Sequence, residues 1–293
     1  MKPFYIGLSC LSNDAEHHAN TGEAEDHCSL NALQEGEVSP HGRARVPASP
    51  LCGALPRNAP PGGLGPPGPP LKTGRTLHAE GRRVLALLDA ERSGRAREPA
   101  AIAAENGGRP FFVDRHADFN ISHSRHMAAA AWSEAVNPAS GLPLRVGCDI
   151  QHVSPGKNRE AVARNYYSPD ENDYIGVAGN TAEGERIERF YRIWVLKESY
   201  LKAKGLSVLD MRTSPSFAVR DGLVKETPVP FVFFLYELDG GNAGRYLLAV
   251  CREIPAAAPL PEIRWFSPPL ALKHLAVIGA FRHRKGVSDT AGA

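Results

Sequence analysis

The chain has 293 residues, with 34 Lys and Arg residues against 32 Asp and Glu residues and a formal net charge of +2. This balance argues against wholesale electrostatic capture of nucleic acid, so we expect no nucleic-acid partner. The five cysteines are scattered, odd in number and without a CxxC pair, which favours neither a zinc site nor a disulfide framework and fits a reducing cytoplasm. No apolar run approaches the ~18 residues of a membrane helix, so we expect no membrane partner.

The N-terminal part predicts a strand, an insert and a helix. The first apolar run, MKPFYIGLSCL (1–11), favours a β-strand because it lacks the basic flank and cleavage site of a secretory segment. Residues 47–70 are rich in proline and glycine, which remove backbone donors and add chain entropy, so we expect a disordered insert there. Residues 75–92 place leucine and valine among charges in the pattern of an amphipathic helix.

The rest of the chain predicts a second run of strands and helices. Residues 117–132 and 142–153 are typical of strands separated by the turn-rich link NPASGLP. SPDE (168–171) indicates a helix start with proline at its first position, and residues 189–205 predict a longer helix that ends at a glycine. Residues 231–251 predict a hairpin with a Gly-rich turn. The order of elements suggests two similar halves that meet near Pro143.

The strand LRVGCDIQ (144–151) carries the first candidate site. Its alternation places Asp149 and Gln151 on the face opposite Cys148, and Gly147 would leave open space beside them. Oxygen atoms from these two side chains suit a hard cation such as Mg²⁺, whereas the alternative interpretation is an exposed strand end.

The helix at 189–205 carries the second candidate site. Glu198 and Lys202 lie one helical turn apart, so they form either a surface ion pair or part of a functional group. A carboxylate between Lys197 and Lys202 suits phosphoryl transfer, because a carboxylate holds a metal or accepts a proton and ammonium groups neutralise phosphate oxygens.

Two further stretches offer hydrogen-bond donors. FNISHS supplies Asn120, Ser122, His123 and Ser124, which could bond phosphate oxygens through hydroxyl, imidazole or backbone donors, although a lone histidine is usually structural. Arg109, between Gly and Pro in GGRPFF, could present a guanidinium group from a turn.

These motifs occur in a recognisable order: GRP, DFNISHS, VGCDIQ, NYYSPDE and FYRIWVLKESYLKAKGLSV. The chain resembles the surfactin-type 4'-phosphopantetheinyl transferases, which carry GKP, FNxSHS, GIDIE, FxSxxE and a WxxKExxxKxxGxG-like helix in this order. The resemblance covers residues 75–252, and VSPHGRAR (38–45) is similar to the family's SPxxRxR stretch. It implies an α+β fold of two similar α+β halves that form an intramolecular pseudo-dimer, with coenzyme A and Mg²⁺ bound between the halves.

The resemblance also implies residue roles. Asp149 and Glu198 would hold Mg²⁺ with help from Gln151, and Glu198 and Lys202 would be catalytic. The residues implied to contact coenzyme A are Arg83, Arg109, Ser122, His123, Lys197 and Lys202, with Arg43 or Arg45 as further candidates for the 3'-phosphate. The implied reaction is transfer of 4'-phosphopantetheine from coenzyme A to a serine of an apo acyl, peptidyl or related carrier protein.

Three departures from the family pattern keep alternatives open. Gln151 stands where many members have Glu, Arg109 stands where they have Lys, and residues 12–73 match poorly. A noncatalytic module that binds carrier protein or coenzyme A is the main alternative, and a Mg²⁺-dependent enzyme acting on another nucleotide diphosphate is a second. We expect a monomer with an N-terminal half at 1–141, a C-terminal half at 142–284 and a flexible tail at 285–293.

Overall fold

A computed structural model of the chain describes most of residues 74–280 and one N-terminal strand. The described ranges are 2–10, 74–94, 101–105, 108–156, 158–176, 179–219, 222–255, 258–266 and 272–280. The expectations for the insert at 47–70, for Arg43 and Arg45, and for the tail at 285–293 lie outside these ranges.

The first sheet has four strands in the order β12-β1-β5-β4, and helix α1 covers it. The predicted first strand is β1 (Phe4–Cys10), and the predicted amphipathic helix is α1 (Gly74–Ser93). Strand β4 (Asp118–Ser124) and strand β5 (Met127–Ser133) form a hairpin. Because β5 is mostly alanine, the small side chains let α1 approach the sheet closely.

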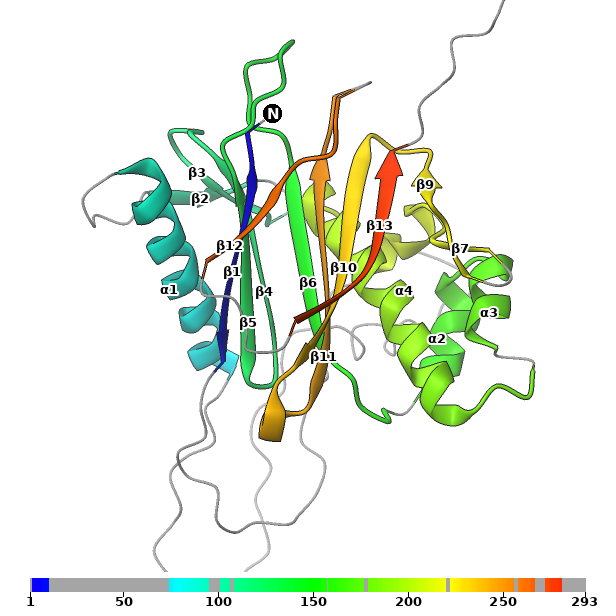
Figure 1. Cartoon of the computed structure of the whole chain (residues 1–293). Helices are drawn as coiled ribbons and strands as arrows, with labels where there is room; N and C mark the ends of the chain where they lie inside the picture. The colour runs from blue at the N-terminus through cyan, green and yellow to red at the C-terminus, as the bar shows by residue number, and fades with distance from the viewer. Residues whose placement is uncertain are drawn as a thin grey trace, which may run out of the picture.

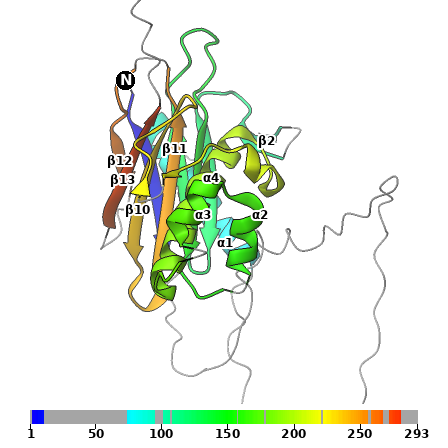
Figure 2. The ribbon, with the colours of Figure 1, turned by 90° about the vertical axis from the view of Figure 1, so that its right-hand side faces the viewer.

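The second sheet has five strands in the order β6-β11-β10-β13-β9, and helix α4 covers one face of it (Figures 1 and 2). Strand β6 (Val146–His152) pairs with β11 (Arg245–Glu253), which forms the predicted hairpin with β10 (Phe231–Asp239). Helix α4 (Glu183–Lys204) ends at Gly205, which adopts the left-handed conformation that glycine tolerates best.

Smaller elements complete the described fold. Helix α3 (Pro169–Ile175) begins with the predicted capping box between Ser168 and Glu171. The remaining elements are α2 (Arg159–Tyr166), β2 (Ile102–Ala104), β3 (Pro110–Phe112), β7 (Ala218–Val219), β8 (Gly222–Leu223), β9 (Glu226–Thr227), β12 (Ile263–Phe266), β13 (Leu272–Ala280) and the 3-10 turns Val208–Thr213 and Gly241–Ala243. No helix among the described residues combines the length and apolarity that crossing a membrane requires.

Three apolar clusters hold these layers together. One lies between α1 and the first sheet and includes Trp132, and another lies under α4 and includes Trp194. The third joins the two sheets to each other, with Phe4 from β1 and Phe234 from β10 in one cluster. The chain is therefore a mixed α+β protein whose two sheets share a core.

The inner edges of the two sheets meet where β4 lies beside β6 (Figure 1). One C-terminal segment also crosses between the sheets, because β12 pairs in parallel with β1. Residues 263–266 therefore lie in the first sheet, although they fall within the range 142–284 expected for the C-terminal half.

Candidate active site

A ladder of side-chain hydrogen bonds joins β4 to β6. Alternate β4 residues accept hydrogen bonds from alternate β6 backbone N–H groups, always 28 residues further along the chain. The four rungs run from Val146 to Asp118 at 2.7 Å, from Cys148 to Asn120 at 3.0 Å, from Ile150 to Ser122 at 3.2 Å and from His152 to Ser124 at 3.0 Å. The DFNISHS motif therefore supplies the oxygen atoms that satisfy the edge of β6, and it fixes which β6 residue faces which β4 residue.

Asp149 lies at the centre of a polar cluster on this seam. Its Oδ1 atom accepts hydrogen bonds from the Ser122 hydroxyl group at 2.9 Å and from the Lys202 ammonium group at 2.5 Å. Lys202 also donates to the Ser122 Oγ atom at 3.0 Å, and the Gln151 amide nitrogen donates to the Asp149 Oδ2 atom at 3.2 Å. The structure thus brings together these four residues, all predicted as site residues.

The Asp149 carboxylate is not at an exposed strand end, because the residue is only 1 % exposed. The expected open space at Gly147 is also wrong. A Cβ atom there would lie 2.0 Å from the Ser199 carbonyl oxygen, so glycine is needed for α4 to approach β6. This close approach positions Glu198 and Lys202 against Asp149.

Glu198 is the second buried carboxylate of the cluster. Its Oε1 atom is buried and makes no hydrogen bond within the described part of the chain. Burial, and then the negative charge of Asp149, raises the pKa of Glu198 to about 7, while Lys202 acts in the opposite direction. Lys202 pairs with Asp149 rather than with Glu198, so the helix-surface ion pair considered from the sequence is absent from the described ion pairs.

The donor set fits a divalent cation. Two carboxylates and one amide supply oxygen ligands of the kind that Mg²⁺ prefers, and the orphaned Oε1 atom of Glu198 is a buried acceptor without a partner. The described residues contain no group of three or more His, Cys, Asp and Glu side chains arranged for a metal, so further ligands would come from a substrate or water.

A cleft of about 270 Å³ opens beside Lys202. Its lining residues are His78, Arg82, Ile102, Gly108, Arg109, Pro110, Phe119, Asn120, Ile121, Lys202, Gly205 and Leu206. The His123 ring lies near this cleft, 5.9 Å from the His78 ring, and burial together with the charge of Lys202 lowers the pKa of His123. A larger cavity of about 450 Å³ between α2 and α4 contains none of the cluster residues.

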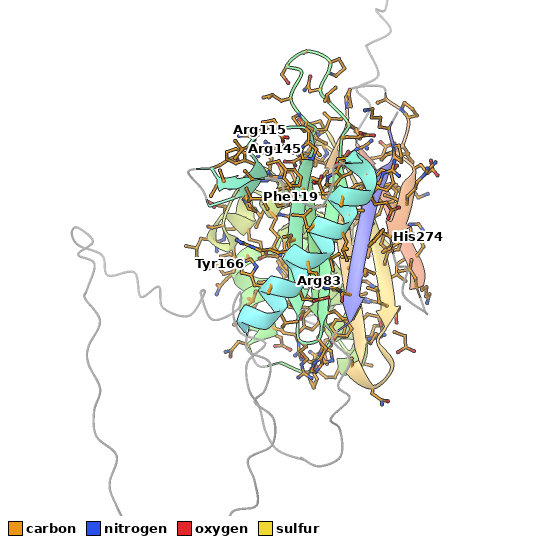
Figure 3. The ribbon with its side chains drawn as sticks, turned by 90° about the vertical axis from the view of Figure 1, so that its left-hand side faces the viewer. Arg83, Arg115, Phe119, Arg145, Tyr166 and His274 are labelled. Carbon is orange, nitrogen blue, oxygen red and sulfur yellow. The ribbon has the colours of Figure 1, made fainter. Side chains whose placement is uncertain are left out.

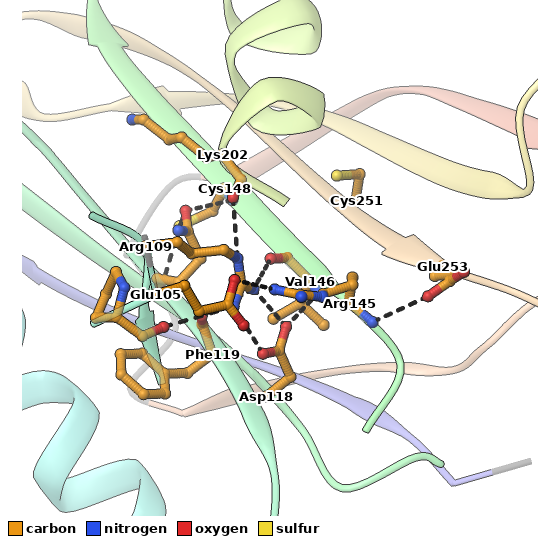
Figure 4. A network of polar contacts seen from close by, with 12 residues as sticks. Glu105, Arg109, Asp118, Phe119, Arg145, Val146, Cys148, Lys202, Cys251 and Glu253 are labelled. Carbon is orange, nitrogen blue, oxygen red and sulfur yellow. Dashed lines mark hydrogen bonds and ion pairs between the residues drawn. The ribbon is translucent and has the colours of Figure 1, made fainter. Parts of the chain in front are cut away.

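The guanidinium group of Arg109, expected to contact coenzyme A, is engaged by protein groups instead of being presented from an exposed turn. The residue is 4 % exposed, and its side chain forms a two-point ion pair with Asp118 at 2.5 and 2.9 Å (Figure 4). It also donates to the carbonyl groups of Val146 at 3.0 Å and Lys202 at 3.1 Å. Arg109 therefore ties β4, β6 and the end of α4 together.

Lys197 also lies elsewhere than predicted. Its ammonium group is buried, 3.1 Å from the Glu171 carboxylate and 3.0 Å from the Ser214 hydroxyl group. Glu171 in turn accepts a hydrogen bond from the backbone of Ser168 at the start of α3. Neighbouring residues on a helix point about 100° apart, so Glu198 faces the cluster while Lys197 faces α3.

Arg83 is not among the residues that line the cleft. Its side chain is exposed on α1 (Figure 3), and it pairs with Glu80. The preceding residue, Arg82, lines the cleft instead, together with His78 one helical turn before it. The sequence prediction missed both residues, and the helical spacing of four between them was the signal that could have found them.

Comparison with known proteins agrees with this geometry. Residues 145–251 match the model of the 4'-phosphopantetheinyl transferase superfamily, a range that holds Asp149, Glu198 and Lys202. Over this range the chain is similar to the members of that superfamily. Together with the relatives described next, this match confirms the surfactin-type family predicted from the motifs.

Several relatives of the chain are named phosphopantetheinyl transferases. The 4'-phosphopantetheinyl transferase ffp of Bacillus subtilis is 33 % identical over 165 residues, which are 53 % of this chain and 63 % of that protein. The phosphopantetheinyl transferase of Thraustochytrium sp. is 38 % identical over 148 residues, or 46 % of this chain and 44 % of that protein. HetI of Nostoc sp. is 30 % identical over 105 residues, or 34 % of this chain and 40 % of that protein. The alignments thus span about half the length of these relatives.

Proposed function

We propose that the chain transfers 4'-phosphopantetheine from coenzyme A to a serine of an apo carrier protein and releases 3',5'-ADP. The observation that carries this proposal is the cluster of Asp149, Glu198 and Lys202 at the seam between the two sheets, beside a cleft rimmed by His78 and Arg82. Buried carboxylates beside cationic groups are the arrangement that phosphoryl transfer requires.

Each residue of the cluster has a place in this reaction. The serine oxygen of the carrier protein bonds to the β-phosphorus atom of coenzyme A while the bond from that phosphorus to the ADP oxygen breaks. Glu198, with a pKa of about 7, accepts the serine proton, since a base works best with a pKa near the working pH. Lys202 neutralises charge on the departing ADP.

A divalent cation such as Mg²⁺, when held by Asp149 and Glu198 with the amide oxygen of Gln151, supplies positive charge next to the diphosphate group. Ser122 orients Asp149 through its 2.9 Å hydrogen bond and also accepts one from Lys202. His123, near the cleft, remains a candidate contact for the diphosphate group.

We also infer an intramolecular pseudo-dimer with halves near 1–141 and 142–284. Two features support it: a long helix covers each sheet, α1 on the first and α4 on the second, and the cluster lies between inner strands β4 and β6. An active site completed within one chain needs no partner subunit, so we expect a monomer. The scattered cysteines without a CxxC pair favour the cytoplasm.

Labelled coenzyme A, incubated with Mg²⁺ and with or without an apo carrier protein, tests the proposal by intact mass. We expect the label on the carrier serine and 3',5'-ADP in solution. Binding without transfer would support a noncatalytic module instead, and cleavage without a carrier would indicate a different nucleotide-diphosphate enzyme.

A further inference from the structure

Asn120 makes one hydrogen bond that fixes the orientation of its side-chain amide. The residue is 5 % exposed, and its Oδ1 atom accepts the backbone N–H group of Cys148 at 3.0 Å. A backbone N–H group only donates, so the atom facing Cys148 must be the amide oxygen. The Nδ2 atom is therefore not the atom that faces Cys148.

None of the hydrogen bonds that join Asn120 to its described neighbours uses this amide nitrogen, and Asn120 lies in the lining of the cleft beside Lys202. Its two N–H groups are therefore candidate donors to a ligand in the cleft. Neighbouring rungs differ in this respect, because the hydroxyl groups of Ser122 and Ser124 accept from β6 without placing an amide group beside them.

The cleft lining also restricts the chemistry of a ligand. Among its residues within the described ranges, His78, Arg82, Asn120 and Lys202 bring donors or positive charge, and none is acidic. Such a lining favours a group that only accepts hydrogen bonds and is negatively charged. A phosphate oxygen meets both conditions.

We propose that Asn120 has two roles in the site: its oxygen atom holds β6 in register, and its amide nitrogen donates to a phosphate oxygen of the bound ligand. The inference rests on the proposed function, in which coenzyme A is that ligand. It adds a binding residue to the cleft and explains why a carboxamide, rather than a third serine, stands at this rung.

Two substitutions separate the roles. Asn120→Ser keeps a neutral acceptor of the kind that the next two rungs use, but removes the N–H donors. Asn120→Asp keeps the acceptor for Cys148 and places a carboxylate oxygen where the amide nitrogen was. Ser124→Ala is the matched control, since it removes the His152 rung outside the cleft lining.

Titration calorimetry with coenzyme A and with dephospho-coenzyme A, alongside thermal unfolding, provides the test. We expect Asn120→Ser to weaken coenzyme A binding about tenfold or more, because hydrogen bonds to charged groups are the stronger kind. Asn120→Asp should weaken it further through repulsion. Ser124→Ala should lower the unfolding temperature with little change in affinity.

Comparison of the two ligands, coenzyme A and dephospho-coenzyme A, identifies which phosphate Asn120 contacts. Equal loss for both ligands supports a contact with the diphosphate, and loss confined to coenzyme A supports a contact with the 3'-phosphate. Wild-type affinity in both Asn120 variants, or an equal loss in Ser124→Ala, would overturn the role of Asn120 alone. A wild-type protein that binds neither ligand would overturn the proposed function as well.

Discussion

Glu198 combines burial with an unpaired oxygen atom, and this combination makes the stability of the protein depend on pH. Its pKa is raised from 4.5 to about 7 by burial and by the charge of Asp149. The folded chain therefore holds this proton more tightly than the unfolded chain. The stabilisation from the proton is complete below pH 4.5 and is lost as the pH rises to about 7.

Glu198→Gln should remove this dependence, because a neutral amide replaces the buried charge. With a chelator present, we expect the variant to be more stable than wild type at pH 8, by up to about 3 kcal/mol, with little difference at pH 4.5. Urea unfolding at both pH values measures the effect. The same variant should lose transfer activity at every pH, and equal stability differences at both pH values would refute the raised pKa.

Gln151 stands beside Asp149, with its amide nitrogen as a donor. Gln151→Glu replaces this hydrogen bond with a second carboxylate, so repulsion should destabilise the metal-free protein. Mg²⁺ gains more from a carboxylate than from an amide, so the variant should reach half-maximal transfer at a lower Mg²⁺ concentration.

Two readouts test this prediction, namely unfolding in chelator and holo-carrier formation across a Mg²⁺ titration. Asp149→Asn is the opposing control, because it removes a charged oxygen and should suppress transfer strongly. An unchanged Mg²⁺ curve for Gln151→Glu would remove Gln151 from the metal site, whereas full activity of Asp149→Asn at low Mg²⁺ would remove the site itself.

The positions of some site residues could be predicted from the sequence, whereas those of others depend on which way the side chain points in the folded protein. Alternation along β6 placed Asp149 correctly, and the helical stripe placed Glu198 and Lys202 on one face. The sequence did not predict that Lys197 and Arg109 pair with buried carboxylates. A positive charge next to a motif does not show whether such a carboxylate already pairs with it. Glu171 and Asp118 are those carboxylates, and each lies on an element whose approach is set by the tertiary fold.

Gly147 controls the distance between α4 and β6. A Cβ atom at this position would lie 2.0 Å from the Ser199 carbonyl oxygen and 2.9 Å from Ala203. Gly147→Ala should therefore push α4 off β6, destabilise the protein by about 1–3 kcal/mol and separate Lys202 from Asp149. Urea unfolding and coenzyme A affinity should both show the loss.

Gly184→Ala is the matched control in the first turn of α4, since a Cβ atom there meets nothing within 4 Å. Alanine at such a position should leave the protein equally stable or slightly more stable. If Gly147→Ala behaved like this control, α4 and β6 would not be in the described contact.

Element types and order were predictable, while one helix boundary and the strand partners were not. The predicted strands, the capping box of α3 and the glycine end of α4 are all present. Helix α4 starts at Glu183, whereas the sequence predicted a start near Arg189. The prediction missed the first turn because that turn is charged and exposed and has no apolar periodicity. The pairing of β12 with β1 joins segments over 250 residues apart, which no local pattern encodes.

The whole molecule should unfold as one unit. The apolar cluster between the sheets includes residues of β1, β5, β6 and β10, and β12 crosses into the first sheet. Trp132 reports on the first sheet and Trp194 on α4, and the third tryptophan, Trp265, lies in β12 of the first sheet. Replacing Trp265 and Trp132 by Phe leaves Trp194 as the fluorophore, and replacing Trp265 and Trp194 leaves Trp132. We expect each double variant to unfold, by fluorescence, at a midpoint that coincides with that from circular dichroism. Two separated transitions would show that the halves are independent domains.

The constant offset of 28 residues along the β4–β6 ladder determines where the chain tolerates a change in length. The link after β5 includes the exposed turn at Ala139–Leu142, so an added residue there changes only loop length. An added residue inside β4 would instead turn Phe119, Ile121 and His123 toward the edge of β6, because alternate strand residues point in opposite directions. We therefore expect the chain to tolerate an insertion in the link after β5 but not one inside β4.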